Sequence, residues 1–149
     1  MTITAQEKAQ SNRHFWHSIT TEASPEAIWS VWTDVPHWKD WDSGLQDASL
    51  AGDFAQGAKG KIISLEGRSS KFKLVAVEQG KSYTMKTKLP LGALYVKRSM
   101  ETTGTTTRFT HEVWFKGLTA GLFARAFGAD FRAMLPGVVR NVDQIASAL

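Results

Sequence analysis

Residues 93–115, with the sequence ALYVKRSMETTGTTTRFTHEVWF, decide the fold of this 149-residue chain. Gly104 and Thr105 predict a two-residue hairpin turn, because glycine supplies the positive φ that such a turn needs at its first central position. In that register, one face brings together opposite charges, hydroxyls and aromatic rings, which are pairs that stabilise neighbouring strands. These pairs are Glu101 with Arg108, Lys97 with Glu112, Ser99 with Thr110 and Tyr95 with Trp114. We expect this face to lie in solvent.

The other face of the hairpin is apolar except at one place, where Arg98 lies opposite His111. A slip of one residue would move its apolar side chains into water. A guanidinium on such a face needs a partner or a wet cavity, because burying an unpaired charge is very costly. Arg98 and His111 are therefore the first candidate functional residues. The apolar pairs are Met100 with Phe109, Val96 with Val113 and Leu94 with Phe115.

The composition is that of one small globular domain. Six Trp and eight Phe supply large apolar surfaces for a core or a cavity. The absence of cysteine excludes disulfides, thiolate catalysis and cysteine-ligated metals. The net charge is +4, but the lysines between residues 59 and 97 alternate mostly with apolar residues, as on solvated sheet faces. No nucleic-acid-binding motif accompanies them, so we expect no nucleic-acid partner.

The N-terminal segment, Met1 to Arg13, is polar and lacks the apolar core of a signal peptide. The chain also has no apolar run long enough for a membrane span. We therefore expect a flexible tail over residues 1–13, one domain over residues 14–149, a cytoplasmic location and no stable membrane insertion. We expect a monomer or a homodimer.

The segment after the tail predicts a strand and two short helices. His14 to Glu22 alternates with period two, as a strand does. Ser24 and Pro25 then favour a helix start, as an N-cap and a proline at the first helical position. Pro36 ends that helix, and Trp38 and Trp41, three residues apart, indicate a second short helix.

The rest of the chain predicts a meander and a long helix. Short turns divide residues 47–116 into about six strands, so consecutive strands pair antiparallel. Two of these strands, Lys61 to Leu65 and Lys71 to Val77, carry apolar residues on both faces, which indicates a bulge. Apolar spacings of three and four predict a helix from Thr119 to Leu149, with a kink at Pro136.

Specific residues carry a resemblance to a known group of proteins. They are the run ITTEASPEAIW (19–29), Thr33-Asp34, WKDWD (38–42) and the turn Gly104 to Arg108. With the order of elements, they make the chain similar to the START-like (SRPBCC) superfamily and, within it, to the polyketide cyclase/dehydrase and lipid transport group. The resemblance implies an α+β helix-grip fold: a curved antiparallel seven-stranded sheet around a long C-terminal helix, with two short helices between strands 1 and 2. It also implies a ligand cavity between sheet and helix.

Our leading hypothesis is a protein that binds a small hydrophobic or amphipathic ligand, either lipid or polyketide-like, in that cavity. Arg98 suits an acidic or carbonyl oxygen, and its charge should keep His111 neutral. Phe127 and Phe131, four residues apart, should point from the C-terminal helix toward the sheet. A structural role is the alternative for each residue. The expected ligand-binding residues are His17, Trp38, Tyr83, Met85, Thr87, Val96, Arg98, Met100, Phe109, His111, Phe127 and Phe131.

Two other functions compete with ligand binding. One is a cyclase/dehydrase-type enzyme, with His111 as acid or base and Arg98 stabilising an oxyanion. The other is an interaction module resembling activators of the heat-shock chaperone. A cavity with converging polar groups would favour binding or catalysis, whereas a collapsed cavity with a large exposed apolar patch would favour the module. We expect no cofactor, and no metal site, because His14 and His17 lie on opposite faces of their strand.

Overall fold

The computed structural model describes residues 9–149 and contains one seven-stranded antiparallel sheet, in the order β1-β7-β6-β5-β4-β3-β2. Of the expected N-terminal tail, residues 1–8 lie outside the described part. Within residues 9–149, no helix is long and apolar enough to cross a membrane. The elements are β1 (His14–Thr21), α1 (Pro25–Thr33), η2 (Val35–Asp40), β2 (Leu45–Leu50), β3 (Lys59–Ser64), β4 (Ser69–Glu78), β5 (Ser82–Leu89), β6 (Gly92–Thr103), β7 (Thr106–Gly117), α2 (Ala120–Phe123), η3 (Ala124–Gly128) and α3 (Ala129–Ser147).

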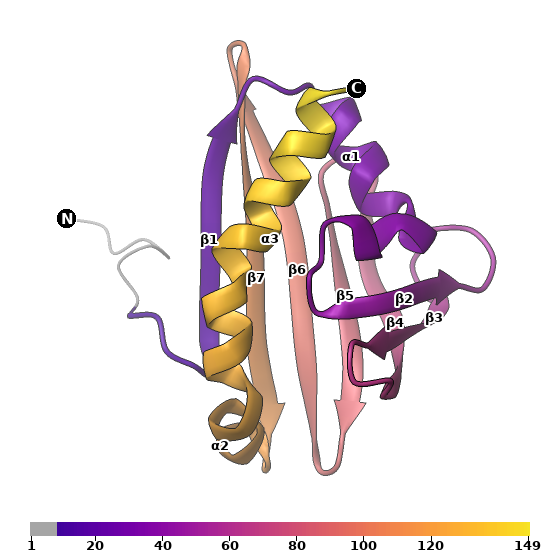
Figure 1. Cartoon of the computed structure of the whole chain (residues 1–149), viewed down its shortest axis with the longest axis vertical. Helices are drawn as coiled ribbons and strands as arrows, with labels where there is room; N and C mark the ends of the chain where they lie inside the picture. Colours follow the sequence, from indigo (N-terminus) through magenta and orange to yellow (C-terminus); the bar gives the residue numbers. More distant parts are fainter. Residues whose placement is uncertain (1–8) are drawn as a thin grey trace.

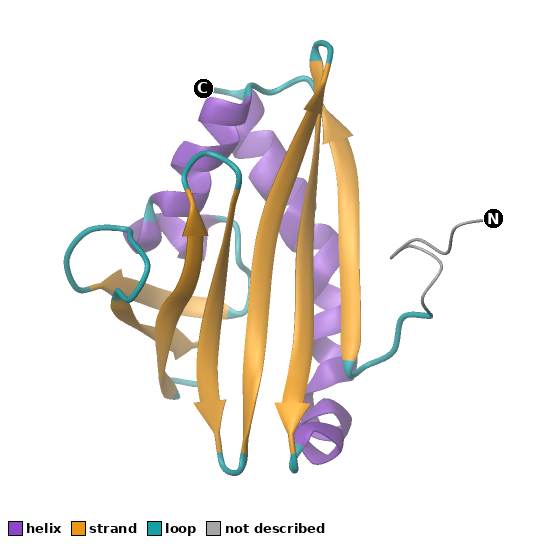
Figure 2. Cartoon of the chain, turned by 180° about the vertical axis from the view of Figure 1, so that it is seen from behind, coloured by secondary structure: helices purple, strands orange, loops and turns teal. Residues whose placement is uncertain are grey.

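The layers match the helix-grip expectation. In Figure 1, α3 crosses one face of the sheet over β1 and β7, and it also packs against α1. Figure 2 shows the sheet from behind, where no helix covers the described strands. The inner face therefore forms the core with the helices, while the outer face meets solvent.

The hairpin register predicted from residues 93–115 is confirmed in full. Arg98 lies opposite His111, with the apolar and the polar pairs on their expected faces, and Gly104 has a φ of 62°. One detail differs on the outer face. The Glu112 carboxylate lies 2.5 Å from Nε2 of His14, and within residues 9–149 no ion pair joins it to Lys97. The register thus holds without the expected charge contact.

The first strand and the first helix form for the reasons seen in the sequence. The Ser24 side chain accepts a hydrogen bond from the Ala27 backbone N–H at 3.1 Å, as an N-cap residue should. The second short helix is a 3-10 helix that contains Pro36. In β4 the pairing with β5 shifts between Leu74 and Ala76, so the bulge expected there is present.

The C-terminal helical segment is continuous from Ala120 to Ser147 and contains an irregular stretch that the sequence pattern does not predict. The helix runs through Pro136 within α3, while a π-helical stretch, η3, occupies residues 124–128. At the end of that stretch Gly128 packs against the chain before β1. A Cβ there would lie 2.1 Å from the Asn12 carbonyl oxygen, so a side chain would push the two segments apart.

One expectation for this segment is wrong. Phe127 is 36% exposed and stacks between Phe123 and Phe131 along the helix surface, with ring centroids 6.1 and 6.3 Å apart. Phe131 is half-buried and packs against the core. The three stacked rings lie on one side of the helical segment, and within this stack Phe131 reaches the core while Phe127 stays at its solvent-exposed edge.

Candidate functional site

Arg98 is buried in the middle of the inner face of the sheet. Its side chain is 5% exposed, and its strand neighbours on either side are Tyr83 in β5 and His111 in β7. One guanidinium nitrogen donates a hydrogen bond to the Tyr83 hydroxyl, and Met85 Sδ lies 3.9 Å from the same nitrogen. Within residues 9–149, no carboxylate lies within 4.0 Å of this guanidinium, and Nε has no partner. The positive charge is therefore held mainly by neutral groups.

Aromatic rings surround the guanidinium. Its central carbon lies 4.8 Å from the ring centroid of Trp41, 5.2 Å from that of Trp38 and 5.5 Å from that of Tyr83. Cation–π contacts of this kind attract a cation more strongly when water is excluded. All three rings are at most 1% exposed. They therefore cover the guanidinium and shield it from solvent.

His111 is fixed by a tryptophan from the first helix. Nε1 of Trp32 donates a hydrogen bond to Nε2 of His111 at 3.1 Å. Because an indole only donates, Nε2 must be the accepting nitrogen, and the ring hydrogen of neutral His111 lies on Nδ1. That buried Nδ1 has no partner in the described part of the chain. A donor is thus left free beside Arg98 and His17, the residues opposite His111 in the register.

The surroundings hold His111 in its neutral form. Burial lowers the pKa of His111 well below its ordinary value, and the charge on Arg98 lowers it further, with a smaller contribution from His17. This agrees with the expectation that Arg98 keeps the histidine neutral.

The low pKa predicts a loss of stability in acid. Below about pH 6.5 the unfolded chain protonates this histidine and the folded chain does not, so the free energy of unfolding falls as pH decreases. For one group, the loss from pH 7.5 to pH 5 is about 2 kcal/mol. Denaturant unfolding at both values should show a smaller loss for His111→Gln than for the unsubstituted protein. His37→Gln changes an exposed histidine whose pKa is raised by its hydrogen bond to Asp34, so this variant should show at least the full loss.

Asp42 is a functional candidate that the sequence analysis missed. It follows Trp41 and remains partly exposed, and its Oδ1 accepts a hydrogen bond from the Gly44 backbone N–H at 3.0 Å. Burial raises the pKa of this carboxyl, while the nearby charge of Arg98 and the Gly44 hydrogen bond lower it. The tryptophan spacing drew attention to WKDWD, but nothing in that spacing shows that the last Asp faces a strand more than fifty residues away.

Seven of the twelve expected ligand-binding residues are buried, and five are not. His17, Thr87, Val96 and Phe131 are half-buried, and Phe127 is exposed. His17 lies directly opposite His111, on the expected face. The residues that the structure buries are Trp38, Tyr83, Met85, Arg98, Met100, Phe109 and His111.

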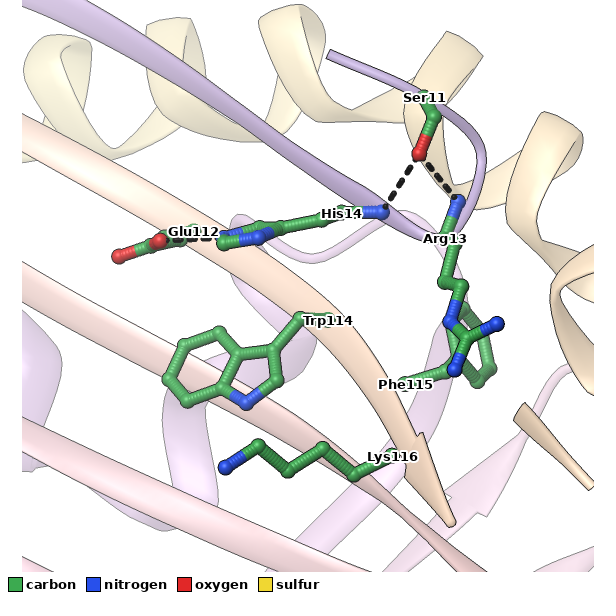
Figure 3. A pocket seen from close by; sticks show the side chains of 7 residues that line it. All are labelled: Ser11, Arg13, His14, Glu112, Trp114, Phe115 and Lys116. Atoms are coloured by element: carbon green, nitrogen blue, oxygen red, sulfur yellow. Dashed lines mark hydrogen bonds and ion pairs between the residues drawn. The ribbon is translucent and has the colours of Figure 1, made fainter. Parts of the chain in front are cut away.

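A separate hollow of about 440 Å³ lies where β1 begins and β7 ends (Figure 3). His14 reaches from it to Glu112, and the indole of Trp114 lies beside them (Figure 3). None of the expected ligand-binding residues lines it, and Arg13 and Lys116 make it basic. Its lining residues are Ser11, Arg13, His14, Glu112, Trp114, Phe115 and Lys116.

Comparison with family models assigns the chain. The model of the family described as polyketide cyclase / dehydrase and lipid transport matches residues 13–143. The chain belongs to this family. The polyketide cyclase/dehydrase and lipid transport family has the START-like, ligand-binding type of fold that the sequence analysis expected. Comparison with curated proteins finds no match.

Solved structures agree with this family's fold. A protein of Mesorhizobium loti has a TM-score of 0.73 at 19% identity, covering 91% of this chain and 98% of that chain. A protein of Nitrosomonas europaea has a TM-score of 0.71 at 11% identity, covering 94% of this chain and 97% of that chain. A protein of Arthrobacter aurescens has a TM-score of 0.70 at 14% identity, covering 95% of this chain and 91% of that chain. At such identities the likeness shows the fold alone.

Proposed function

We propose that this member of the family binds a small amphipathic ligand, lipid-like or polyketide-like, and recognises an acidic or carbonyl oxygen of that ligand through Arg98. The single observation that carries the proposal is a guanidinium that is 5% exposed, with no carboxylate within 4.0 Å in residues 9–149. Burying a charge without an opposite charge in direct contact is costly, and the Asp42 carboxyl acts on Arg98 only from beyond that distance. A site that receives an anionic or strongly accepting group would explain why the fold keeps it.

The groups around Arg98 fit such a ligand. The fork of an arginine can bind a carboxylate through two parallel hydrogen bonds. Nε of Arg98 and Nδ1 of His111 are donors without a partner in the described chain, so both can serve an oxygen. Apolar residues next to them, such as Met100 and Phe109, suit the hydrocarbon part of an amphipathic molecule.

The ligand reaches Arg98 by displacing an aromatic ring. Trp41 lies on the short connection between η2 and β2, where Nδ2 of Asn141 in α3 donates a hydrogen bond to its carbonyl at 3.2 Å. Its indole Nε1 is buried and has no partner in residues 9–149. Moving the Trp41 ring therefore breaks no indole hydrogen bond. Moving the Trp38 ring would break the bond that its indole donates to the Trp32 carbonyl at 2.8 Å.

Calorimetry with dodecanoate and dodecanol tests the proposal, because the two differ chiefly in the charged head. A hydrogen bond to a charged group contributes about 1.5 to 3 kcal/mol, which is roughly ten- to hundredfold in affinity. We expect dodecanoate to bind more tightly by that factor at neutral pH. Equal affinity for the two, or no binding of either, would contradict recognition of an acidic head at Arg98.

A second candidate function is acid–base catalysis of the cyclase/dehydrase type. Two observations favour it: His111 stays neutral with an unpartnered Nδ1–H, and the pKa of Asp42 is raised. A carboxyl with a raised pKa can take up and release a proton nearer to neutral pH than an ordinary carboxyl, and the neutral imidazole can donate its Nδ1–H to a substrate oxygen. Arg98 would then stabilise negative charge that develops on the substrate oxygen.

His111→Gln and Asp42→Asn separate catalysis from binding. If either group moves a proton, turnover of a polyketide-like substrate should fall by roughly 10²- to 10⁴-fold in its variant. Affinity for dodecanoate, measured by calorimetry, should change much less. Turnover that survives in both variants would exclude these residues as the acid and base.

A further inference from the structure

The turn from β5 to β6 and the connection from β7 to α2 lie at the same end of the molecule (Figure 1), and both carry exposed apolar side chains. Within residues 9–149, the other large apolar side chains that lie exposed are Leu65, in the β3–β4 turn, and Leu149, at the last position of the chain. We call the four at this end the leucine end. They are Leu91, 73% exposed, Leu118, 90%, Leu122, 64%, and Phe127, 36%.

The leucine end is built into the fold. The Leu118 backbone N–H donates to the Leu91 carbonyl at 3.0 Å, and the Thr119 hydroxyl donates to the Pro90 carbonyl at 2.6 Å. Leu91 has a φ of 55°, the one positive value outside glycine in the described chain. Glycine or asparagine usually occupies such a turn position, because other side chains are strained there. A turn that only connected two strands would have no need of an outward leucine.

The charges around the leucine end are positive. Lys88, Lys116 and Arg125 are exposed in the segments that form it. Residues 79–100 and 113–129 contain no Asp or Glu, and the next acid along the helix is Asp130. Lys116 also lines, together with Arg13, the hollow at the start of β1 and the end of β7 (Figure 3). An apolar surface is thus bordered by cations.

We propose that the leucine end docks on an anionic lipid surface. Apolar side chains that project beyond a basic border can enter the boundary between headgroups and acyl chains, while the cations attract acidic headgroups. This docking is peripheral. It does not depend on Arg98 or on the function proposed for the inner site.

A second copy of this chain fits the leucine end less well. A two-fold interface places the same patch on both partners, so Lys88, Lys116 and Arg125 of each copy would face like charges. An acidic protein partner, as a chaperone-activator-like module would require, shares the charge preference. Binding to pure lipid vesicles distinguishes the two, because no protein partner is present.

The test is flotation of the full chain with phosphatidylcholine vesicles, with and without phosphatidylglycerol. We expect binding only when phosphatidylglycerol is present, weakening as salt screens the charges. The doubly substituted Leu118→Ser, Leu122→Ser variant should bind at least about tenfold more weakly, since each buried leucine contributes that order of affinity. Lys88→Glu combined with Arg125→Glu should also lose binding.

Leu65→Ser is the matched control, because Leu65 is 63% exposed in a different turn. It should bind vesicles like the unsubstituted protein. The proposal is overturned if the chain ignores both kinds of vesicle, if it binds neutral vesicles equally well, or if Leu65→Ser weakens binding as much as the double variant. Unchanged melting temperatures keep misfolding apart from loss of docking. A dimer that the double variant abolishes, without vesicle binding, would assign the patch to self-association instead.

Discussion

An Arg98→Leu variant is expected to lose the preference for dodecanoate over dodecanol while remaining folded. The preference of roughly ten- to hundredfold should fall to about one, because leucine cannot form the charge-assisted hydrogen bond. Folding should survive, since replacing a buried charge by an apolar side chain is often neutral or stabilising. The substitution does leave the Tyr83 hydroxyl without its arginine partner. Calorimetry with both ligands, after a check of the melting temperature, measures the change.

Lys97→Leu is the matched control for this variant. Lys97 directly precedes Arg98 in β6. Its substitution therefore removes a positive charge from the same strand, but from the outer face. It should keep the acid preference. Loss of affinity for both ligands in Arg98→Leu by the same factor would mean that the arginine shapes the site without recognising an acid. Loss of the preference in Lys97→Leu would mean that the net charge of the protein, and not Arg98, selects the acid.

The hairpin explains why so much of the fold could be predicted. Strand side chains alternate between faces, so the apolar pairs and the polar pairs of residues 93–115 are compatible with one register only. That register predicts Arg98 beside His111, and the pairing of β6 with β7 confirms it. The same alternation predicts Tyr83 and Met85 on the inner face, where both lie next to Arg98.

What the sequence could not show depends on contacts between distant elements. The rings of Trp38 and Trp41 reach Arg98 only because η2 folds back over the sheet, and no local period encodes that approach. Asp42 is brought near Arg98 by the same loop. The spacing of four does place the Phe127 and Phe131 rings side by side, but it does not show how far along the helix the contact with the core extends, and Phe127 remains exposed.

A Phe109→Ala variant is expected to show a larger loss of stability than any other single substitution proposed in this chain. Phe109 is 0% exposed, and its ring lies 6.0 Å from the rings of both Trp32 and His111, measured between centroids. Truncating a fully buried phenylalanine costs about 3 to 5 kcal/mol, because apolar contacts are lost and a cavity remains. For a domain of this size, the melting temperature should fall by roughly 10 °C or more.

Phe127→Ala is the matched control for Phe109→Ala. The sequence pattern predicts Phe127 in the same core, but its ring is 36% exposed and only stacks on its helical neighbours. Stacked aromatic pairs contribute about 1 kcal/mol, so Phe127→Ala should lower the free energy of unfolding by about that amount. Thermal and urea denaturation of both variants measure the difference. Similar losses in the two would mean that Phe127 packs into the core.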